Sequence, residues 1–134
     1  MTLTSLYDIA VQDNTDVYSF DLGKCESLSL LDDGYCFIAI DPFKIKSEAD
    51  EKVKLAHELG HCETGAFYNE YAVCDVRSKH EYTANKWAIK KLIPEDELKE
   101  ACKFCNNRWE LSEYFGVTED FMQKAMDYYS QLVA

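Results

Sequence analysis

His57-Glu58-Leu59-Gly60-His61 is an H-E-x-x-H motif in a stretch whose residue pattern predicts a helix. Residues four apart lie on one face of a helix with their Cβ atoms about 5–6 Å apart, so the two imidazoles can bind one ion. Glu58 is turned about 100° around the helix, because an α-helix has roughly 3.6 residues per turn. Its carboxylate then lies beside the ion, within reach of a water molecule. The motif therefore predicts a zinc-dependent hydrolase.

The flanking sequence supports a helix that begins after Ser47 and runs towards Phe67. Ser47 is a suitable N-cap, and the acids that follow it complement the helix dipole. The chain has only 3 His, and two stand in the motif. This favours a metal site over two partly exposed histidines on an ordinary helix. Two faces recur at helical spacing: Leu55, Leu59, Cys62 and Ala66 on an apolar face, and Val53, His57, Gly60 and His61 on the other.

A catalytic zinc needs a third protein ligand and an open position for water. Metzincins carry a Gly three positions and a His six positions after the motif, and this chain has Thr64 and Phe67 there, which excludes that class. A second helix is predicted over residues 78–89, before Pro94. On this helix Glu81 shares a face with small and apolar residues, as a helix packed against the metal-binding helix requires. We therefore take Glu81 as the third ligand.

Asn85 lies one turn after Glu81 on the same predicted face. Its side chain could accept a hydrogen bond from the free ring nitrogen of a ligand histidine and fix the tautomer of that ring. Both residues have a simpler interpretation. Glu81 could be the capping-box partner of Ser78, and Asn85 could be an ordinary surface amide.

At these residues the chain resembles the ImmA/IrrE-type metallopeptidases of bacteria and their mobile elements. Residues 55–61 are similar to the metal-binding helix of that family, and residues 81–88 followed by 92–94 are similar to its E-x-x-A-N-x-[FW]-A…L-[LMI]-P helix. Two motifs in this order are far more specific than one. Residues 34–42 are similar to the strand before the metal-binding helix. The resemblance covers residues 28–94 well and both ends of the chain loosely.

The resemblance implies a small zincin with one zinc ion, whose ligands are His57, His61 and Glu81, and with Glu58 as the catalytic base. In several such proteins the substrate is a helix-turn-helix repressor, often that of a prophage or integrative element, and cleavage derepresses its genes. The chain departs from the family pattern in His80 beside Glu81, in the short link between the motif helices and in its cysteine content.

The predicted ligands indicate a mechanism. Zinc activates water and polarises the scissile carbonyl, while Glu58 takes a proton and later delivers it to the leaving amine. The oxyanion needs a further donor, and His80, Tyr82, Tyr68 and Tyr71 are near in sequence. We take His80 as the candidate, against the alternative of a plain surface histidine. Two histidines and a carboxylate do not exclude manganese or iron.

Composition limits the organisation of the chain. With 134 residues and 47% hydrophobic content, one domain over residues 1–134 is expected, with the sheet and metal-binding helices in 1–94 and a helical C-terminal subdomain in 95–134. No apolar run approaches the roughly 18 residues of a membrane span, and residues 1–20 lack the features of a signal peptide. We therefore expect a cytoplasmic protein whose 6 Cys are reduced thiols.

Cys102-Lys103-Phe104-Cys105 is a C-x-x-C pair, which can indicate redox chemistry or half of a structural zinc site. A full zinc site would need a second close pair, which the sequence lacks. On the helix expected after Pro94, both thiols share a face with Leu98 and Ala101, so we expect them to serve as small core residues, and the same holds for Cys62. The cysteines outside this pair are scattered singly: Cys25, Cys36, Cys62 and Cys74.

The net charge of −11, from 14 basic and 25 acidic residues, argues against nucleic acid as a direct ligand. Residues 47–94 hold 8 acids and 7 bases, whereas residues 1–46 hold 8 against 3 and residues 95–134 hold 9 against 4. Acidic flanks suit a basic protein partner, such as a DNA-binding repressor. The alternative is an acidic surface that serves only solubility.

The whole pattern predicts an α+β fold, with a short antiparallel sheet packed on the metal-binding helix pair and a helical C-terminus. Strand and turn signals before the motif suggest a helix followed by three strands. Caps and glycine positions after Pro94 suggest three helices. The expected elements are a helix near 3–10, strands at 17–22, 27–31 and 35–40, and helices at 95–105, at 109–115 closed by Gly116, and after Thr118 as N-cap.

Residues 109–118 suggest a helix-turn-helix, but the last 40 residues contain too few bases for DNA binding. We expect one face of the last helix to pack on the body of the protein or to form a partner-docking surface. That face consists of Phe121, Ala125, Tyr128 and Leu132.

Two functions from different classes are compatible with the sequence. The first is a metalloendopeptidase that cleaves a cytoplasmic regulator. The second is an antirepressor or toxin-like interaction module that binds a regulator without cutting it. The intact Glu58 favours the enzyme, because a pure binding module needs no base beside the metal.

Overall fold

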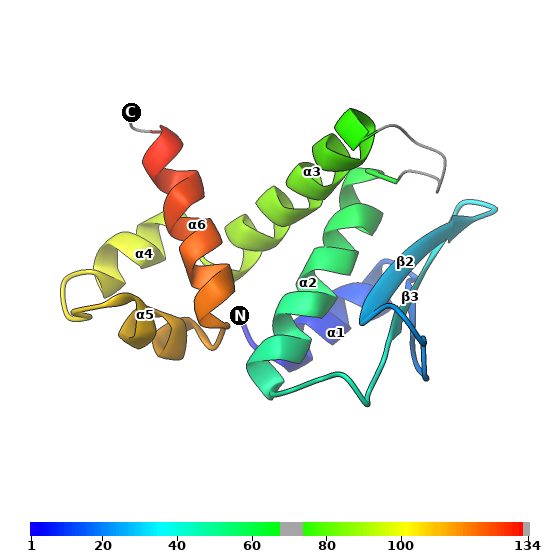
Figure 1. The fold of residues 1–134 in the computed structure, drawn as a ribbon, viewed down its shortest axis with the longest axis horizontal. Helices are drawn as coiled ribbons and strands as arrows, with labels where there is room; N and C mark the ends of the chain where they lie inside the picture. Colours follow the sequence, from blue (N-terminus) through cyan, green and yellow to red (C-terminus); the bar gives the residue numbers. More distant parts are fainter. Residues whose placement is uncertain (68–73, 133–134) are drawn as a thin grey trace.

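The computed structural model of the chain describes residues 1–67 and 74–132. The described part is an α+β fold with a helical C-terminus, as predicted (Figure 1). Its elements in chain order are α1 (Leu3–Gln12), β1 (Asp16–Ser19), β2 (Ser27–Asp32), β3 (Tyr35–Ile40), α2 (Glu48–Thr64), α3 (Cys74–Leu92), α4 (Glu95–Ala101), α5 (Arg108–Phe115) and α6 (Glu119–Leu132).

The three strands form a mixed sheet in the order β1-β3-β2. β2 and β3 are an antiparallel hairpin in which Asp32 pairs with Tyr35, and Asp33 and Gly34 form the two-residue turn with positive φ angles of 51° and 82°. This part of the predicted sheet is confirmed. It could be predicted from the sequence because an Asp-Gly turn selects this hairpin geometry locally.

The prediction of a purely antiparallel sheet is wrong for β1, which pairs with β3 in parallel. Residues 20–26 do not fold back as a hairpin; they cross the end of β3, where the amide of Leu22 donates to the Asp41 carboxylate. The most apolar strand, β3, thereby takes the central position. Because the β2–β3 hairpin reverses the chain, β1 and β3 run in the same direction, and β1 ends at Ser19 rather than at residue 22.

α2 lies against the sheet on one side and is crossed by α3 on the other. Ser47 is its N-cap, and its hydroxyl accepts a hydrogen bond from the Asp50 amide at 3.1 Å. The helix ends at Thr64, short of the predicted Phe67, because Gly65 adopts a left-handed conformation with a φ angle of 69°. α3 begins before Ser78, so Ser78 is not its N-cap and the capping-box interpretation of Glu81 is wrong.

One hydrophobic core runs from the sheet through the central helices to the C-terminal helices. Phe121, Ala125 and Tyr128 of α6 belong to this core as predicted, whereas Leu132 is exposed. Among the described residues, no helix is both long and apolar enough to cross a lipid bilayer. The fully buried large side chains are Leu6, Ile38, Leu55, Leu59, Leu92, Ile93, Met122 and Asp41.

The cysteines match the expectation only in part. Cys36 of β3 and Cys62 of α2 form a disulfide, so the prediction of six reduced thiols is wrong for this pair. The pairing arises because α2 lies across the face of the sheet to which Cys36 points, which sequence spacing does not reveal. Cys102 is exposed, contrary to the expectation, since α4 ends at Ala101 and residues 102–104 form turns rather than a continued helical face. Cys105 and Cys62 are half-buried and pack against the hydrophobic core, as predicted.

Candidate metal centre

The site is built where α2 and α3 cross at very close range. A Cβ atom added to Gly60 of α2 would lie 2.5 Å from the carbonyl oxygen of Ala84 of α3. Only a glycine permits this approach, because the atom it would meet belongs to the backbone. Gly60 thus has a packing role within the motif that its pattern did not reveal, and it brings the two helices that carry the predicted ligands together.

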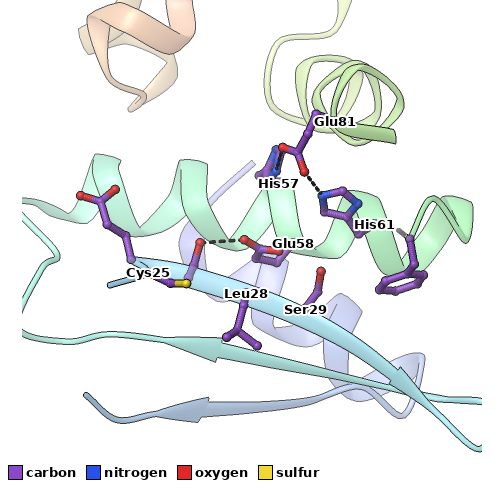
Figure 2. Close-up of a pocket in the computed structure, with 10 residues that line it drawn as sticks. Cys25, Leu28, Ser29, His57, Glu58, His61 and Glu81 are labelled. Atoms are coloured by element: carbon purple, nitrogen blue, oxygen red, sulfur yellow. Dashed lines mark hydrogen bonds and ion pairs between the residues drawn. The ribbon is translucent and has the colours of Figure 1, made fainter. Parts of the chain in front are cut away.

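At the crossing, His57 and His61 of α2 face Glu81 of α3. The Nε2 atom of His57 lies 2.9 Å from Oε2 of Glu81, and the Nε2 atom of His61 lies 3.0 Å from Oε1 (Figure 2). One ligand atom from each of the three residues lies within 4.8 Å of the others. Two imidazole nitrogens and a carboxylate that converge in this way match the donor set of a catalytic zinc.

The second nitrogen of each ring is held by a separate hydrogen bond. Nδ1 of His57 donates to Oδ1 of Asn85 at 2.7 Å, and Nδ1 of His61 donates to the carbonyl oxygen of Ala66. The left-handed turn at Gly65 brings that carbonyl back to His61. With a proton on each Nδ1, both Nε2 atoms can offer a lone pair to a cation. These residues therefore fit a metal ion.

The charges at the site are strongly coupled. Burial lowers the pKa of His61, but hydrogen bonds with Glu81 and the Ala66 carbonyl outweigh burial and raise this pKa above its ordinary value. The two histidines in turn hold the pKa of Glu81 well below its usual range. Glu81 is thus kept ionised, so that a cation shared between the carboxylate and the imidazoles is favoured.

Glu58 is buried on α2 and points towards the sheet rather than towards α3. Its Oε2 atom accepts a hydrogen bond from the hydroxyl of Ser27 of β2 at 2.7 Å. The sequence analysis did not single out Ser27. Strand alternation was an available signal, because Ser27 and Ser29 share one face of β2 while Leu28 and Leu30 share the other.

His57, Glu58 and His61 line a cleft between α2, α3 and β2. Its volume of about 480 Å³ lies within the range of ligand pockets. β2 is an edge strand and provides one wall of this cleft (Figure 2). The lining residues are Cys25, Glu26, Ser27, Leu28, Ser29, His57, Glu58, His61, Phe67 and Glu81.

The candidate donors for an oxyanion are less clearly placed. His80 is half-buried and is not among the described residues that line the cleft, so its catalytic role stays a prediction. Tyr82 of α3 is largely exposed. Tyr68 and Tyr71 lie outside the described residues.

Two histidines on one turn of a helix and a glutamate from the next helix form a group that could hold a metal ion, with a further acid beside them, an arrangement typical of zincins. The chain belongs to the peptidase M78 family, since residues 16–127 match its IrrE N-terminal-like domain. This match confirms the resemblance drawn from the two motifs and makes the protein a member of a family of zinc metallopeptidases. A comparison with curated proteins gave no match.

Proposed function

We propose that the protein is a zinc-dependent endopeptidase in which His57, His61 and Glu81 hold the ion and Glu58 is the catalytic base. The observation that carries this proposal is the convergence of the three donors in a cleft that Glu58 also lines. Asn85 orients the His57 ring, because its Oδ1 atom accepts a hydrogen bond from Nδ1 of that ring. Manganese and iron remain alternatives for the ion.

When bound, zinc would supply Lewis acidity that polarises the scissile carbonyl and acidifies water. Glu58 takes the proton of that water as its oxygen forms a bond to the carbonyl carbon. The C–N bond then breaks, and Glu58 delivers the proton to the leaving amine. Burial limits the exchange of this proton with bulk solvent, and the Ser27 hydroxyl fixes the carboxylate in place.

We propose that the scissile segment binds in extended form along β2. β3 occupies only one edge of β2, so the other edge can offer backbone hydrogen bonds at the wall of the cleft. Strand addition of this kind supplies affinity through the main chain and leaves specificity to side chains. It requires an unfolded or loop segment of the target.

We further propose that the target is a cytoplasmic regulatory protein, a helix-turn-helix repressor of a prophage or mobile element. Support comes from the resemblance of the two motif helices and from the net charge of −11, which suits a basic DNA-binding partner. Direct binding of nucleic acid is disfavoured by the same charge.

The test is incubation of the zinc-loaded protein with the helix-turn-helix repressor encoded nearest to it. We expect a defined fragment that disappears on addition of a chelator and is absent with Glu58→Gln, a variant that keeps its zinc. Full cleavage by Glu58→Gln would overturn the mechanism. A stable, uncut complex would instead support a non-cleaving antirepressor or toxin-like module.

A further inference from the structure

The outer face of the sheet, the one turned away from α2, is apolar, and none of the described helices lies on it (Figure 1). Alternation places Ile38 and Ile40 of β3 on the inner face, where both are buried. A sheet with one face exposed to solvent normally carries polar residues on that face. Here the outer face instead carries Tyr18 and Phe20 from β1 and its continuation, Leu28 and Leu30 from β2, and Tyr35 and Phe37 from β3.

No described element packs on these six residues. They are absent from the hydrophobic core and from the partly buried residues packed against it, although Val17 and Cys62 on the inner side are included. Tyr35 is 59% exposed and Leu30 is 58% exposed. Figure 2 shows Leu28 on the side of β2 opposite to Glu58, and in Figure 1 the labelled helices lie on the other side of the sheet.

The end of this face next to the β2–β3 turn is acidic. Asp16 pairs in register with Phe37, and Asp32 pairs with Tyr35, so both carboxylates lie on the outer face. Both are exposed, and neither forms an ion pair with another described residue. Residues 16–40 as a whole contain five acids and one base, Lys24. Two carboxylates without an ion-pair partner among the described residues, at one end of an apolar face, favour a partner that carries basic residues beside its apolar surface.

We infer that the outer face binds an amphipathic helix of a protein partner, whose apolar stripe is flanked by lysines or arginines. A helix layer is the usual cover for an apolar sheet face. A second copy of this chain would bring a second acidic end, and an anionic membrane surface would repel it. The inference does not depend on catalysis.

The position of this face gives docking a consequence for the metal centre. Ser27 and Ser29 of β2 line the cleft, whereas the side chain of Leu28, which borders the cleft, and that of Leu30 point to the outer face (Figure 2). A partner bound to the outer face of β2 is therefore separated from the metal centre only by the thickness of this strand. A disordered segment of that partner could reach the cleft around the free edge of β2.

The test uses two hydrocarbon-stapled helical peptides of about 20 residues, long enough to span the sheet at about 1.5 Å per residue. Both carry a leucine stripe, flanked by lysines in one peptide and by glutamates in the other. We expect the basic peptide to bind about tenfold more tightly or better, a difference of about 1.4 kcal/mol. Amide chemical shifts in the ¹⁵N-labelled protein should change at the outward residues of β1, β2 and β3.

Two neighbouring leucines provide a matched pair of variants. Leu30 on the outer face and Leu31 on the inner face are 58% and 57% exposed. Leu30→Asp should weaken peptide binding about tenfold, because it removes apolar area from the docking face, whereas Leu31→Asp should leave it nearly unchanged. Circular dichroism of both variants checks their fold.

Equal effects of the two variants, equal affinity for both peptides, or shifts confined to another surface would overturn the inference. Sedimentation of the free protein adds a further check. A wild-type dimer that Leu30→Asp converts to monomers would assign the face to a second copy, and binding to anionic phosphatidylserine vesicles that depends on Leu30 would assign it to a membrane.

Discussion

Glu58 is buried and accepts a hydrogen bond from the Ser27 hydroxyl, so Ser27 acts as a positioning residue. We expect Ser27→Ala to lower kcat for the cleaved substrate about tenfold, because a hydrogen bond to a charged group contributes on the order of 1.5–3 kcal/mol. KM and zinc content should not change. Ser29→Ala is the matched control, since Ser29 also lines the cleft. A loss confined to KM would argue against positioning.

The close contact between Gly60 of α2 and the backbone of α3 can also be tested. We expect Gly60→Ala to lower the free energy of unfolding by about 1–3 kcal/mol, because its Cβ forces α2 and α3 apart. Since His61 and Glu81 lie on opposite sides of that crossing, zinc affinity should fall in the same variant. Urea unfolding and zinc titration measure the two effects. Wild-type stability would contradict the close contact with Ala84.

The residues of the site were largely accessible from sequence because their spacing is local. His57, His61 and Glu58 follow from one turn of helix, and Glu81 and Asn85 from another. Ser27 and Gly60 were missed, because their roles depend on contacts across 31 residues with Glu58 and with the backbone of α3.

Whole elements also differ in whether local sequence or long-range contacts determine them. The β2–β3 hairpin, the Ser47 cap and the end of α5 at Gly116 were predictable, because turn and cap chemistry is encoded within a few residues. The parallel pairing of β1 was not predictable, because it depends on how residues 20–26 cross the sheet.

The Cys36–Cys62 disulfide joins the central strand β3 to α2 and closes a loop whose ends are 26 residues apart in sequence. For a loop of this length, reduction should lower the free energy of unfolding by about 3.5 kcal/mol. Urea unfolding with and without reductant measures the change. The Cys36→Ala/Cys62→Ala double variant should not respond to reductant, and equal stability of the oxidised and reduced wild type would contradict the role of the bond.

Asp41 connects residues 20–26 to the turn that follows β3. The amide of Leu22 donates to Oδ2 at 3.1 Å, and the amide of Phe43 donates to Oδ1 at 2.9 Å. The Nζ atom of Lys44 lies 3.3 Å from Oδ2. Burial alone would raise the pKa of Asp41, but these partners outweigh burial and lower it below 3.8. The stability that its charge contributes is therefore present above that pH and is lost as the pH falls through the lowered pKa.

In Asp41→Asn an amide NH₂ must face one of the two backbone donors. We expect the variant to be less stable than the wild type at pH 7, with the difference shrinking towards pH 3. Urea midpoints at both pH values measure this. A difference that stays constant would show that the charge of Asp41 contributes nothing.

At the scale of the whole molecule, we propose that residues 1–134 form one domain. The hydrophobic core includes residues from both 1–94 and 95–134. Lys52 of α2 donates to the Phe115 carbonyl at the end of α5, and the hydroxyl of Tyr129 of α6 donates to the Ile93 carbonyl after α3. These contacts predict that both parts unfold together.

Zinc should stabilise this whole unit, because its proposed ligands come from two helices that the unfolded chain does not hold together. At a free zinc concentration about 100 times Kd, the gain is about 2.7 kcal/mol. A chelator should lower Tm in a single transition seen equally by tryptophan fluorescence and far-ultraviolet circular dichroism. Glu81→Gln should abolish most of the zinc response. A chelator response confined to one probe would show that residues 95–134 unfold separately, and no response at all would show that His57, His61 and Glu81 do not hold zinc.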